Sequence, residues 1–325
     1  MLTPVIPVYA LKLGASQLEI GIIASIGSAV YSLATFASGR LADKAGRKHL
    51  VSTSFILYAV SAMLYANSTA PAHLMAVKIL EGLAWGMLWP PLESLIGDRQ
   101  WGSVSRSVSR FGVAWSSGSA LGAAVSAIAL EVPPQIAFTA ASLAAVALAV
   151  VTHVSVEETM KERSREIAKI SLKLLMNRWS VWTPSFIYAF CQSVFLSLFP
   201  AYAEIKGLEA PLISGCLFSL MLTRTVGFWL AGSVKPVMAA VLGAVFLLTG
   251  AIPYAILFYY PMLLAGSAIV GLGASLVYSA AFHEVITAES KERGLNAGIF
   301  ESGLGIGYLT GPLIGGTLAE HELRA

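Results

Sequence analysis

Long apolar runs alternate with short polar connections along almost the whole of this 325-residue chain. Each run is about 20 residues long, the length that an α-helix needs to cross a hydrocarbon layer of about 30 Å. A shorter apolar stretch at residues 1–10 has no positively charged beginning and contains two prolines, so it is a poor signal peptide. The pattern predicts an all-α integral membrane protein with ten full spans, at residues 18–38, 49–68, 73–97, 111–130, 135–154, 179–203, 211–232, 236–258, 261–288 and 295–318.

Composition agrees with a membrane protein, because 56% of the residues are hydrophobic and only 12% are charged. The placement of charge predicts the orientation. If the connection at residues 39–48 is cytoplasmic, 16 of the 21 Lys and Arg residues lie on the cytoplasmic side, 3 lie outside and 2 lie within spans. The positive-inside rule then predicts a multi-pass protein of the plasma membrane in this orientation. The sixteen cytoplasmic residues are Arg40, Lys44, Arg47, Lys48, Arg99, Arg106, Arg110, Lys161, Arg163, Arg165, Lys169, Lys173, Arg178, Lys235, Lys291 and Arg293.

The longest polar stretch, residues 155–178, divides the spans into two sets. Its charged residues are most simply solvated or in contact with lipid headgroups. We therefore predict an N-terminal transmembrane bundle at residues 1–154, a cytoplasmic linker at 155–178 and a C-terminal transmembrane bundle at 179–325.

An internal repeat relates the two bundles. "PVYALKLG" at residues 7–14 shares four identities with "PAYAEIKG" at 200–207, which lies 193 positions later. "LMAVKILEGL" at 74–83 shares four identities with "LLAGSAIVGL" at 263–272, which lies 189 positions later. Two matches in the same order and at nearly the same offset predict two parallel copies of one bundle, an arrangement that places a transport site between the halves.

The strongest motif is "GRLADKAGRKHL" in the first cytoplasmic connection, residues 39–50. It resembles the loop signature of the major facilitator superfamily. The resemblance implies two pseudo-symmetric bundles of six helices, so the chain is expected to lack the inner part of its first helix and the whole of its last. The signature is matched at Gly39, Leu41, Ala42, Asp43, Gly46, Arg47, Lys48 and Leu50.

The resemblance also implies a gate in this loop. Glycines permit a tight turn there, and Asp43 is placed to cap the third helix or to face the positive end of another helix. Arg47 and Lys48 can rest at the headgroups or pair with Asp98. Two interpretations follow: these charges only set the topology, or they form an ionic latch that holds the cytoplasmic side closed and breaks during transport.

The fourth span carries a polar stripe of five residues. Lys78, Glu81, Trp85, Trp89 and Glu93 are spaced 3, 4, 4 and 4 apart, which places them within about 120° of one helix face. An ionisable group in mid-membrane costs roughly 2.5 to 3.5 kcal/mol or more, so this face is expected to line a cavity. The segment is similar to the family's Arg-x-x-Gln-Gly pattern, with lysine and glutamate at the first two fixed positions. The alternative is a neutralised Lys78–Glu81 pair that serves stability alone.

The second half carries two further charges inside predicted spans. Arg224 and Glu301 each lie about 12 Å from the inner end of a span. They are expected to pair across helices, either as a structural ion pair or as a pair in which Glu301 exchanges protons when Arg224 moves away. Tyr308 shares the face of Glu301, and Tyr188 and Gln192 form a milder polar face on the first helix of this half.

Glycine patterns predict close helix packing at Gly118-x-x-x-Gly122 and at Gly307-x-x-x-Gly311-x-x-x-Gly315. The second pattern lies in "GYLTGPLIGG", which is similar to a glycine-proline motif that antiporters of the family carry in the fifth helix. Here the motif falls in the eleventh helix, counted by the family's order. That placement argues against drug export.

The sequence contains no Walker loop and no Cys or His cluster with metal-ligand spacing. We therefore predict a protein that is not an enzyme, has no catalytic residues, cofactor or metal, and does not bind nucleic acid. The predicted function is secondary active transport of a small solute by alternating access, coupled to protons, by a monomer in the lipid bilayer. Efflux of amphipathic compounds and a non-transporting or degenerate membrane protein fragment are the alternatives, and the substrate and direction stay open.

Overall fold

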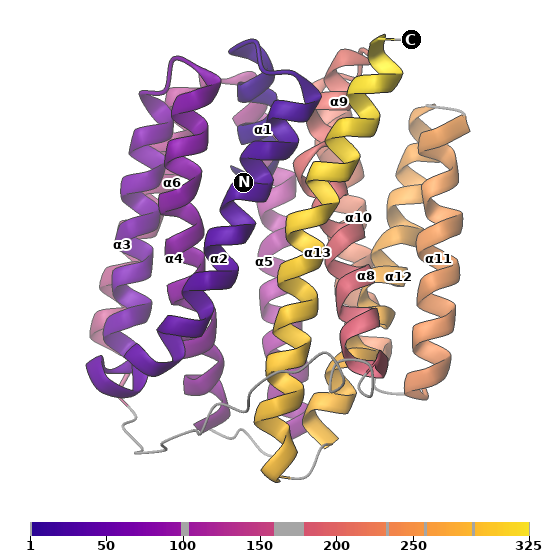
Figure 1. The fold of residues 1–325 in the computed structure, drawn as a ribbon. Helices are drawn as coiled ribbons and strands as arrows, with labels where there is room; N and C mark the ends of the chain where they lie inside the picture. Colours follow the sequence, from indigo (N-terminus) through magenta and orange to yellow (C-terminus); the bar gives the residue numbers. More distant parts are fainter. Residues whose placement is uncertain are drawn as a thin grey trace.

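The computed structural model describes residues 2–98, 104–158, 179–231, 234–256, 259–287 and 290–324. In this part of the chain the regular elements are helices, which stand side by side in one bundle (Figure 1). The first half contains α1 (Leu2–Lys12), α2 (Gln17–Ala45), α3 (Arg47–Ala66), α4 (Pro71–Asp98), α5 (Val104–Glu131) and α6 (Pro134–Ser155). The second half contains α8 (Trp179–Ser197), α9 (Phe199–Ile205), α10 (Ala210–Ala231), α11 (Pro236–Ile256), α12 (Tyr260–Thr287) and α13 (Ser290–Arg324).

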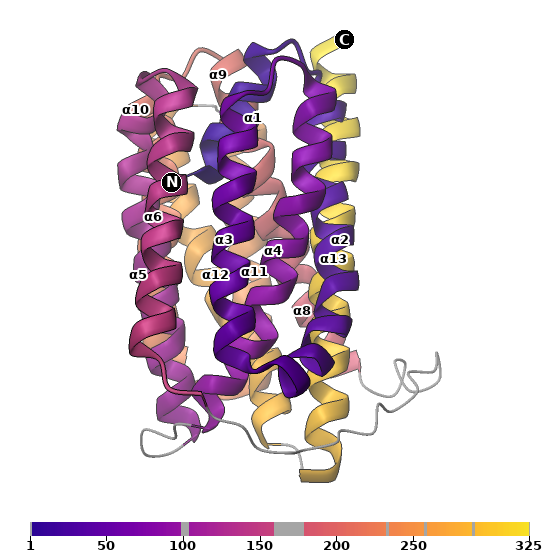
Figure 2. The same ribbon diagram turned by 90° about the vertical axis from the view of Figure 1, so that its left-hand side faces the viewer.

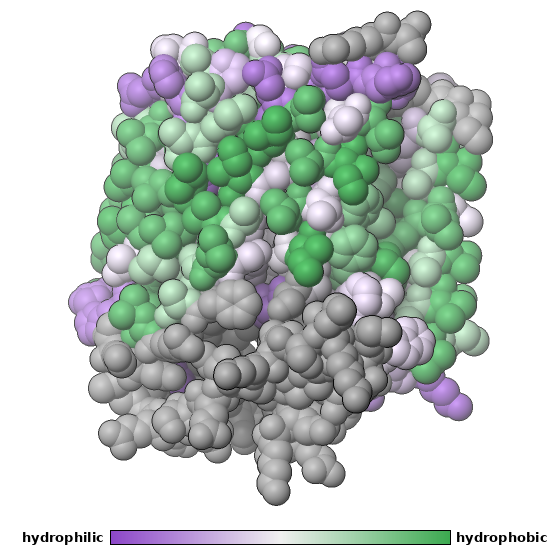
Figure 3. Space-filling view, in the orientation of Figure 1, coloured by the Kyte–Doolittle hydropathy of each residue, from purple (hydrophilic) through white to green (hydrophobic). Residues whose placement is uncertain are grey.

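A helix covers each of the ten expected spans, but α2 continues to Ala45, so most of the expected connection at residues 39–48 is helical. The expected span at residues 179–203 is divided at Leu198 into α8 and the short α9. Eight segments of the described chain are long and apolar enough to cross a membrane. The helices α4 and α13 are not among them, but both run alongside the others (Figure 1). Figure 3 shows a broad hydrophobic area across this face of the bundle, with hydrophilic side chains along its upper edge, the predicted outer end.

The two halves meet mainly through two pairs of helices. The helix α2 of the first half packs on α13 of the second, and α5 of the first packs on α10 of the second. Within the halves, α4 packs on α2 and α3 just as α12 packs on α10 and α11. The short α1 contacts α5, α6, α8 and α9 near the upper end of the bundle (Figure 2). This arrangement is the one expected for two parallel copies of the same bundle.

Both copies of the first repeated string end in the same turn. Gly14 and Gly207 have φ values of +88° and +84°, in the left-handed region that favours glycine. The amide of the residue after each glycine donates to the carbonyl oxygen of Ala10 at 3.0 Å or of Ala203 at 2.9 Å. This six-to-one hydrogen bond is typical of a helix that ends at a left-handed glycine. The repeat therefore extends to backbone geometry.

The second repeated string brings two helices into backbone contact in each half. A Cβ atom at Gly82 of α4 would collide with the carbonyl oxygen of Gly27 in α2. A Cβ atom at Gly271 of α12 would collide with the carbonyl oxygen of Leu220 in α10. Residues 27 and 220 are again 193 positions apart. Glycine is needed at both positions because only a residue without a side chain permits this approach.

The prediction of close packing in α5 fails at Gly118. A Cβ atom at Gly118 of α5 would meet nothing within 4 Å, so this glycine does not permit a tight contact. In α13, by contrast, Cβ atoms at Gly307 and Gly311 would lie 2.6 Å from the carbonyl oxygens of Phe186 and Phe190 in α8. The spacing of glycines identified a close helix contact in α13 but not at Gly118 of α5, because the spacing does not say which face a neighbour covers.

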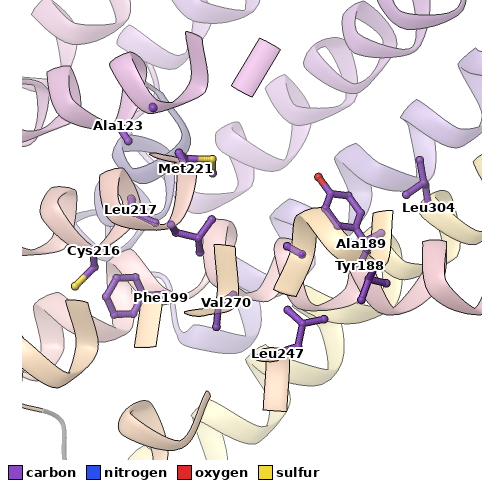
Figure 4. Packing of buried hydrophobic residues seen from close by; sticks show 14 of the residues in the cluster. Ala123, Tyr188, Ala189, Phe199, Cys216, Leu217, Met221, Leu247, Val270 and Leu304 are labelled. Atoms are coloured by element: carbon purple, nitrogen blue, oxygen red, sulfur yellow. The ribbon is translucent and has the colours of Figure 1, made fainter. Parts of the chain in front are cut away.

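A large buried cluster fills the second half and extends into α5. Figure 4 shows ten of its labelled members, which come from α5 and from all six helices of the second half. A separate cluster joins α1 to α2, α3, α4 and α6 in the first half. This second cluster also includes Leu198 and Ala201 of the second half, so both clusters cross the boundary between the halves.

Candidate functional site

A cavity of about 340 Å³ lies between the two halves. Its walls come from α1, α2, α3, α4 and α5 of the first half and from α8, α12 and α13 of the second. Six residues of the expected site line it, namely Lys78, Glu81, Trp85, Trp89, Glu301 and Tyr308. Tyr31, Tyr58, Trp115 and Tyr278 also line it and were not predicted, because single aromatic residues on separate helices leave no pattern in the sequence.

The wall formed by α4 contains a closed ionic network. The Lys78 Nζ atom donates to Glu81 Oε2 at 2.8 Å, one helical turn away. Tyr65 from α3 donates to the same oxygen at 2.6 Å, and Trp85 Nε1 donates to Oε1 at 3.2 Å. Glu81 is 5% exposed. Three donors therefore hold this buried carboxylate as an anion that balances Lys78.

Next to this network, three indole rings form a continuous apolar surface. Trp85 and Trp89 stack with centroids 5.9 Å apart and planes 11° apart. Trp115 from α5 meets Trp89 edge to face at 5.9 Å, and it lies 6.4 Å from Tyr278 of α12. The aromatic surface thus continues from the first half to the second. A surface of this kind favours flat, apolar groups of a ligand.

On the opposite wall, Glu301 of α13 has a sparse environment. In the described part of the chain, its carboxylate accepts one hydrogen bond, from the Tyr31 hydroxyl of α2 at 3.5 Å. The two residues lie on either side of the α2–α13 contact that joins the halves. Glu301 is therefore far less tightly held than Glu81, although both carboxylates line the same cavity.

The structure does not join Arg224 to Glu301. Both side chains are described, and no ion pair within 4 Å connects them. Arg224 Nε donates instead to Ser116 Oγ of α5 at 3.2 Å, and one terminal nitrogen donates to the Tyr188 hydroxyl of α8 at 3.4 Å. The guanidinium carbon lies 4.4 Å from the centre of the Trp115 ring. The side chain turns toward α5 and α8 because hydroxyl groups and an aromatic face are available there.

Two other expected site residues lie behind the cavity wall. Tyr188 is 0% exposed, and its ring packs edge to face on Tyr278 at 4.9 Å. Gln192 is 1% exposed, and its side-chain amide has no hydrogen-bond partner among the described residues. Neither residue belongs to the lining of the cavity. The polar face predicted on α8 is therefore buried in the second half.

At the predicted inner end, the first turn of α3 binds a carboxylate. Gly46, with φ +91°, precedes the helix. The backbone amides of Arg47 and Lys48 donate to Glu158 at 2.9 Å and 3.1 Å. Asp43 was expected to be a cap at this helix end, but Glu158, three residues after the end of α6, accepts these hydrogen bonds. The sequence alone did not indicate Glu158, because it is more than a hundred residues away.

The remaining residues of the expected gate are only partly described. Leu41 is 45% exposed at the inner end of α2. The backbone of Gly39, Asp43 and Asp98 is helical, but their side chains lie outside the described part of the structure. The same is true of Glu93, the last member of the predicted stripe on α4. The ionic latch therefore stays a prediction.

At the predicted outer end, the last turn of α13 binds α9 of the same half. The Tyr202 hydroxyl of α9 donates to Glu322 at 2.7 Å, and Lys206 Nζ lies 3.4 Å from the same carboxylate. The hydrogen bond from Tyr202 holds the pKa of Glu322 below its usual range. The pKa of Lys206 is raised, first by Tyr202 and then by Glu322.

Two contacts join the halves at this end. Lys12 of α1 lies 3.9 Å from Glu204 of α9, where both side chains are substantially exposed. The backbone amide of Gln17 in α2 donates to Glu320 of α13 at 3.0 Å. The outer ends of the two halves are therefore connected by polar contacts.

Comparison with known sequences identifies the family of this chain. Residues 1–285 match the sequence profile of the Major Facilitator Superfamily. The "Quinolone resistance protein NorA" of Staphylococcus aureus strain Mu50 / ATCC 700699 is 22% identical over 351 aligned positions, which cover 100% of this chain and 87% of NorA. The NorA of strain MRSA252 is 25% identical over 219 residues, which cover 63% of this chain and 55% of that protein. The "Multidrug resistance protein MdtL" of Klebsiella pneumoniae strain 342 is 27% identical over 93 residues, or 29% of this chain and 24% of MdtL.

Solved structures of transporters share the fold. A bacterial homologue of the human lysosomal transporter Spinster, inward-facing and occupied, superimposes with a TM-score of 0.77 at 14% identity, covering 98% of this chain and 78% of that one. The nucleoside transporter NupG gives 0.74 at 14% identity, covering 98% and 87%. The human organic anion transporter MFSD10 gives 0.68 at 19% identity, covering 94% and 79%. These matches show a fold built from two helical bundles.

Proposed function

Because the chain belongs to the Major Facilitator Superfamily, we propose that it carries a small solute by alternating access and couples this movement to protons. The cavity between the halves supports the proposal, since residues of both halves line it. A rocking motion of one half against the other would open such a cavity to one side of the membrane and then to the other. The proposed setting is a monomer in the plasma membrane with the linker in the cytoplasm.

Glu301 is the residue that we assign to proton exchange. Glu81 is engaged by Lys78, Tyr65 and Trp85, so a change in its charge would leave Lys78 unbalanced. Among the described residues, Glu301 has one weak hydrogen bond, from Tyr31 across the boundary between the halves. A motion of α2 against α13 would change that contact. The protonation of Glu301 can therefore follow the conformation of the transporter, as coupling requires.

The proposed gate lies at the inner end of α2 and α3. Residues 39–50 carry the family's loop signature, and the hydrogen bonds of Glu158 attach the start of the linker to α3. We assign Asp43, Arg47, Lys48 and Asp98 to an ionic latch that closes this end when the outer contacts open.

The proposal is tested by measuring transport in proteoliposomes under an imposed pH gradient. Uptake or release of the solute is expected to respond to the gradient, and Glu301→Gln is expected to abolish the response while leaving binding in place. The matched control is Glu131→Gln, which removes a carboxylate from an exposed position at the end of α5. An unchanged proton response in Glu301→Gln would remove this residue from the mechanism.

A second candidate function is export of amphipathic compounds. The stacked rings of Trp85, Trp89 and Trp115 favour it, and so do the names of NorA and MdtL as resistance proteins. These observations weigh against the argument from the misplaced glycine-proline motif. Cells that express the chain would then retain less ethidium and norfloxacin than cells that express Glu301→Gln. Equal retention would leave uptake of a small solute as the proposed function.

A further inference from the structure

Arg224 is a buried cation whose contacts with the described residues are uncharged. Its side chain is 1% exposed and bonds to the hydroxyls of Ser116 and Tyr188, with the Trp115 ring across its face. No carboxylate of the described chain lies within 4 Å of it. A guanidinium group has five N–H donors, and two of its nitrogens, Nε and one terminal nitrogen, donate here.

Such an arrangement is costly unless a ligand completes it. A charged side chain near the middle of a membrane costs about 2.5 to 3.5 kcal/mol or more. Buried arginines normally have an acidic partner, because an unpaired charge in a low-dielectric interior is strongly destabilising. The planar fork of a guanidinium group matches the two oxygens of a carboxylate. The missing partner of Arg224 is therefore expected to be an anionic group.

The Trp115 side chain lies between Arg224 and the cavity. Trp115, which covers the guanidinium group, and Tyr278, which packs on Tyr188, both line the cavity. Rotation of the Trp115 side chain would expose the guanidinium group to a ligand there. The same rings would then contact the body of the ligand.

Charge balance limits the ligand further. Glu81 neutralises Lys78 on the α4 wall. When Glu301 is protonated, Arg224 is the remaining uncompensated charge among the described residues of the site. One negative charge on the ligand balances it, so a monoanion fits better than a dianion.

We propose that Arg224 binds the carboxylate of an aromatic organic acid and that Trp115 covers this subsite until the acid binds. The proposal rests on the proposed transport function, because it names the class of substrate for the same cavity. It also gives Arg224 a partner other than Glu301.

The test compares an acid with its neutral amide. Binding of 2-naphthoate and 2-naphthamide to the purified full chain in detergent micelles is measured by equilibrium dialysis, with no pH gradient. The wild type is expected to prefer the acid by about tenfold or more, the value of a charge-assisted hydrogen bond. Arg224→Gln is expected to remove the preference, and Arg224→Lys to reduce it. The matched control, Arg110→Gln, removes an arginine from an exposed position on α5 and is expected to leave the preference unchanged.

Several results would overturn the proposal. Equal binding of acid and amide by the wild type would overturn it without any variant. The proposal can therefore be tested even if Arg224→Gln does not fold. The proposal would also be overturned if folded Arg224→Gln still preferred the acid over the amide. The same holds if Glu301→Gln lost this preference while Arg224→Gln kept it. Because binding is measured at equilibrium, its outcome is separate from the transport assay. Acid preference without a proton response would contradict the proposed coupling alone.

Discussion

In the first half, the Tyr65 hydroxyl donates to Glu81, whose other partners include Lys78; in the second half, the Tyr254 hydroxyl bonds to Ser267. Tyr254 and Ser267 lie 189 positions after Tyr65 and Lys78, so these are equivalent places in the two copies. One copy contains a salt bridge where the other contains two hydroxyl groups. The repeat has kept the place of the contact and has changed its charge.

Packing between the helices shows the opposite behaviour. In the first half, a Cβ atom at Gly86 of α4 would collide with the side chain of Ala34 in α2. In the second half, a Cβ atom at Gly227 of α10 would collide with the side chain of Ser275 in α12. Ser275 lies 189 positions after residue 86, and Gly227 lies 193 positions after Ala34. The glycine of the facing pair is on α4 in the first half and on α10, the equivalent of α2, in the second half. Each pair still contains one glycine. Helix distance is therefore preserved across the repeat while polar chemistry is not.

The largest loss of stability is expected from breaking the Lys78–Glu81 salt bridge, which the equivalent place in the second half lacks. Glu81→Gln leaves Lys78 buried without its counter-charge, which should lower the free energy of unfolding by about 3 to 5 kcal/mol. The equivalent change in the second half, Ser267→Ala, removes a neutral hydrogen bond and should cost about 1 kcal/mol. Denaturant titration in detergent micelles measures both values. Equal losses would contradict the difference that we infer between the halves.

An intermediate loss of stability is expected at the close helix contacts that both halves share. Gly82→Ala and Gly271→Ala each push a methyl group into a neighbouring carbonyl, and each should cost about 1 to 3 kcal/mol. Gly118→Ala is the control, because a Cβ atom there meets nothing within 4 Å. Alanine should stabilise that helix slightly, by up to about 1 kcal/mol. Thermal unfolding of the three variants tests this, and a loss at Gly118 as large as the others would refute it.

A smaller effect is expected at the α3 end that binds the linker. Glu158→Gln weakens the hydrogen bonds from Arg47 and Lys48 and should cost about 1 kcal/mol of local stability. Hydrogen exchange of the first turn of α3 should become faster, and exchange in the second half should stay the same. Faster exchange throughout the protein would mean that Glu158 supports the whole fold and not this helix end.

The smallest effect is expected at the outer end, where the two repeated tyrosines differ. Tyr9 donates to a backbone oxygen, that of Ser68, whereas Tyr202 donates to the carboxylate of Glu322. The pKa of Glu322 is lowered in the folded protein. The folding stability that Glu322 contributes is therefore present above its unfolded pKa and is lost as pH falls through its folded pKa.

Tyr202→Phe should raise the pKa of Glu322 toward its ordinary value and weaken this acid dependence, whereas Tyr9→Phe should not change it. Carbon-13 NMR of labelled glutamate across an acid titration gives the pKa directly. An unchanged value in Tyr202→Phe would assign the shift to Lys206 instead.

The part of the candidate site that lies on a single helix, α4, could be predicted from the sequence. Lys78, Glu81, Trp85 and Trp89 all line the cavity, because helical periodicity alone places them on one face. The two glutamates of the cavity differ in a way that no pattern indicates. The donors to Glu81 lie within 16 positions of it, whereas the hydroxyl next to Glu301 is 270 positions away.

By itself, the sequence determined the helices, the family and the parallel repeat, because apolar length, local turn residues and short motifs act over a few neighbouring positions. Only the tertiary structure decided the partners of the charged groups. Arg224 lies 108 positions from Ser116 and 36 from Tyr188, and it turns toward them and not toward Glu301. The physical reason is that a buried charge takes the polar groups that packing brings within about 3 to 4 Å, and the chain sets those distances only when its helices assemble.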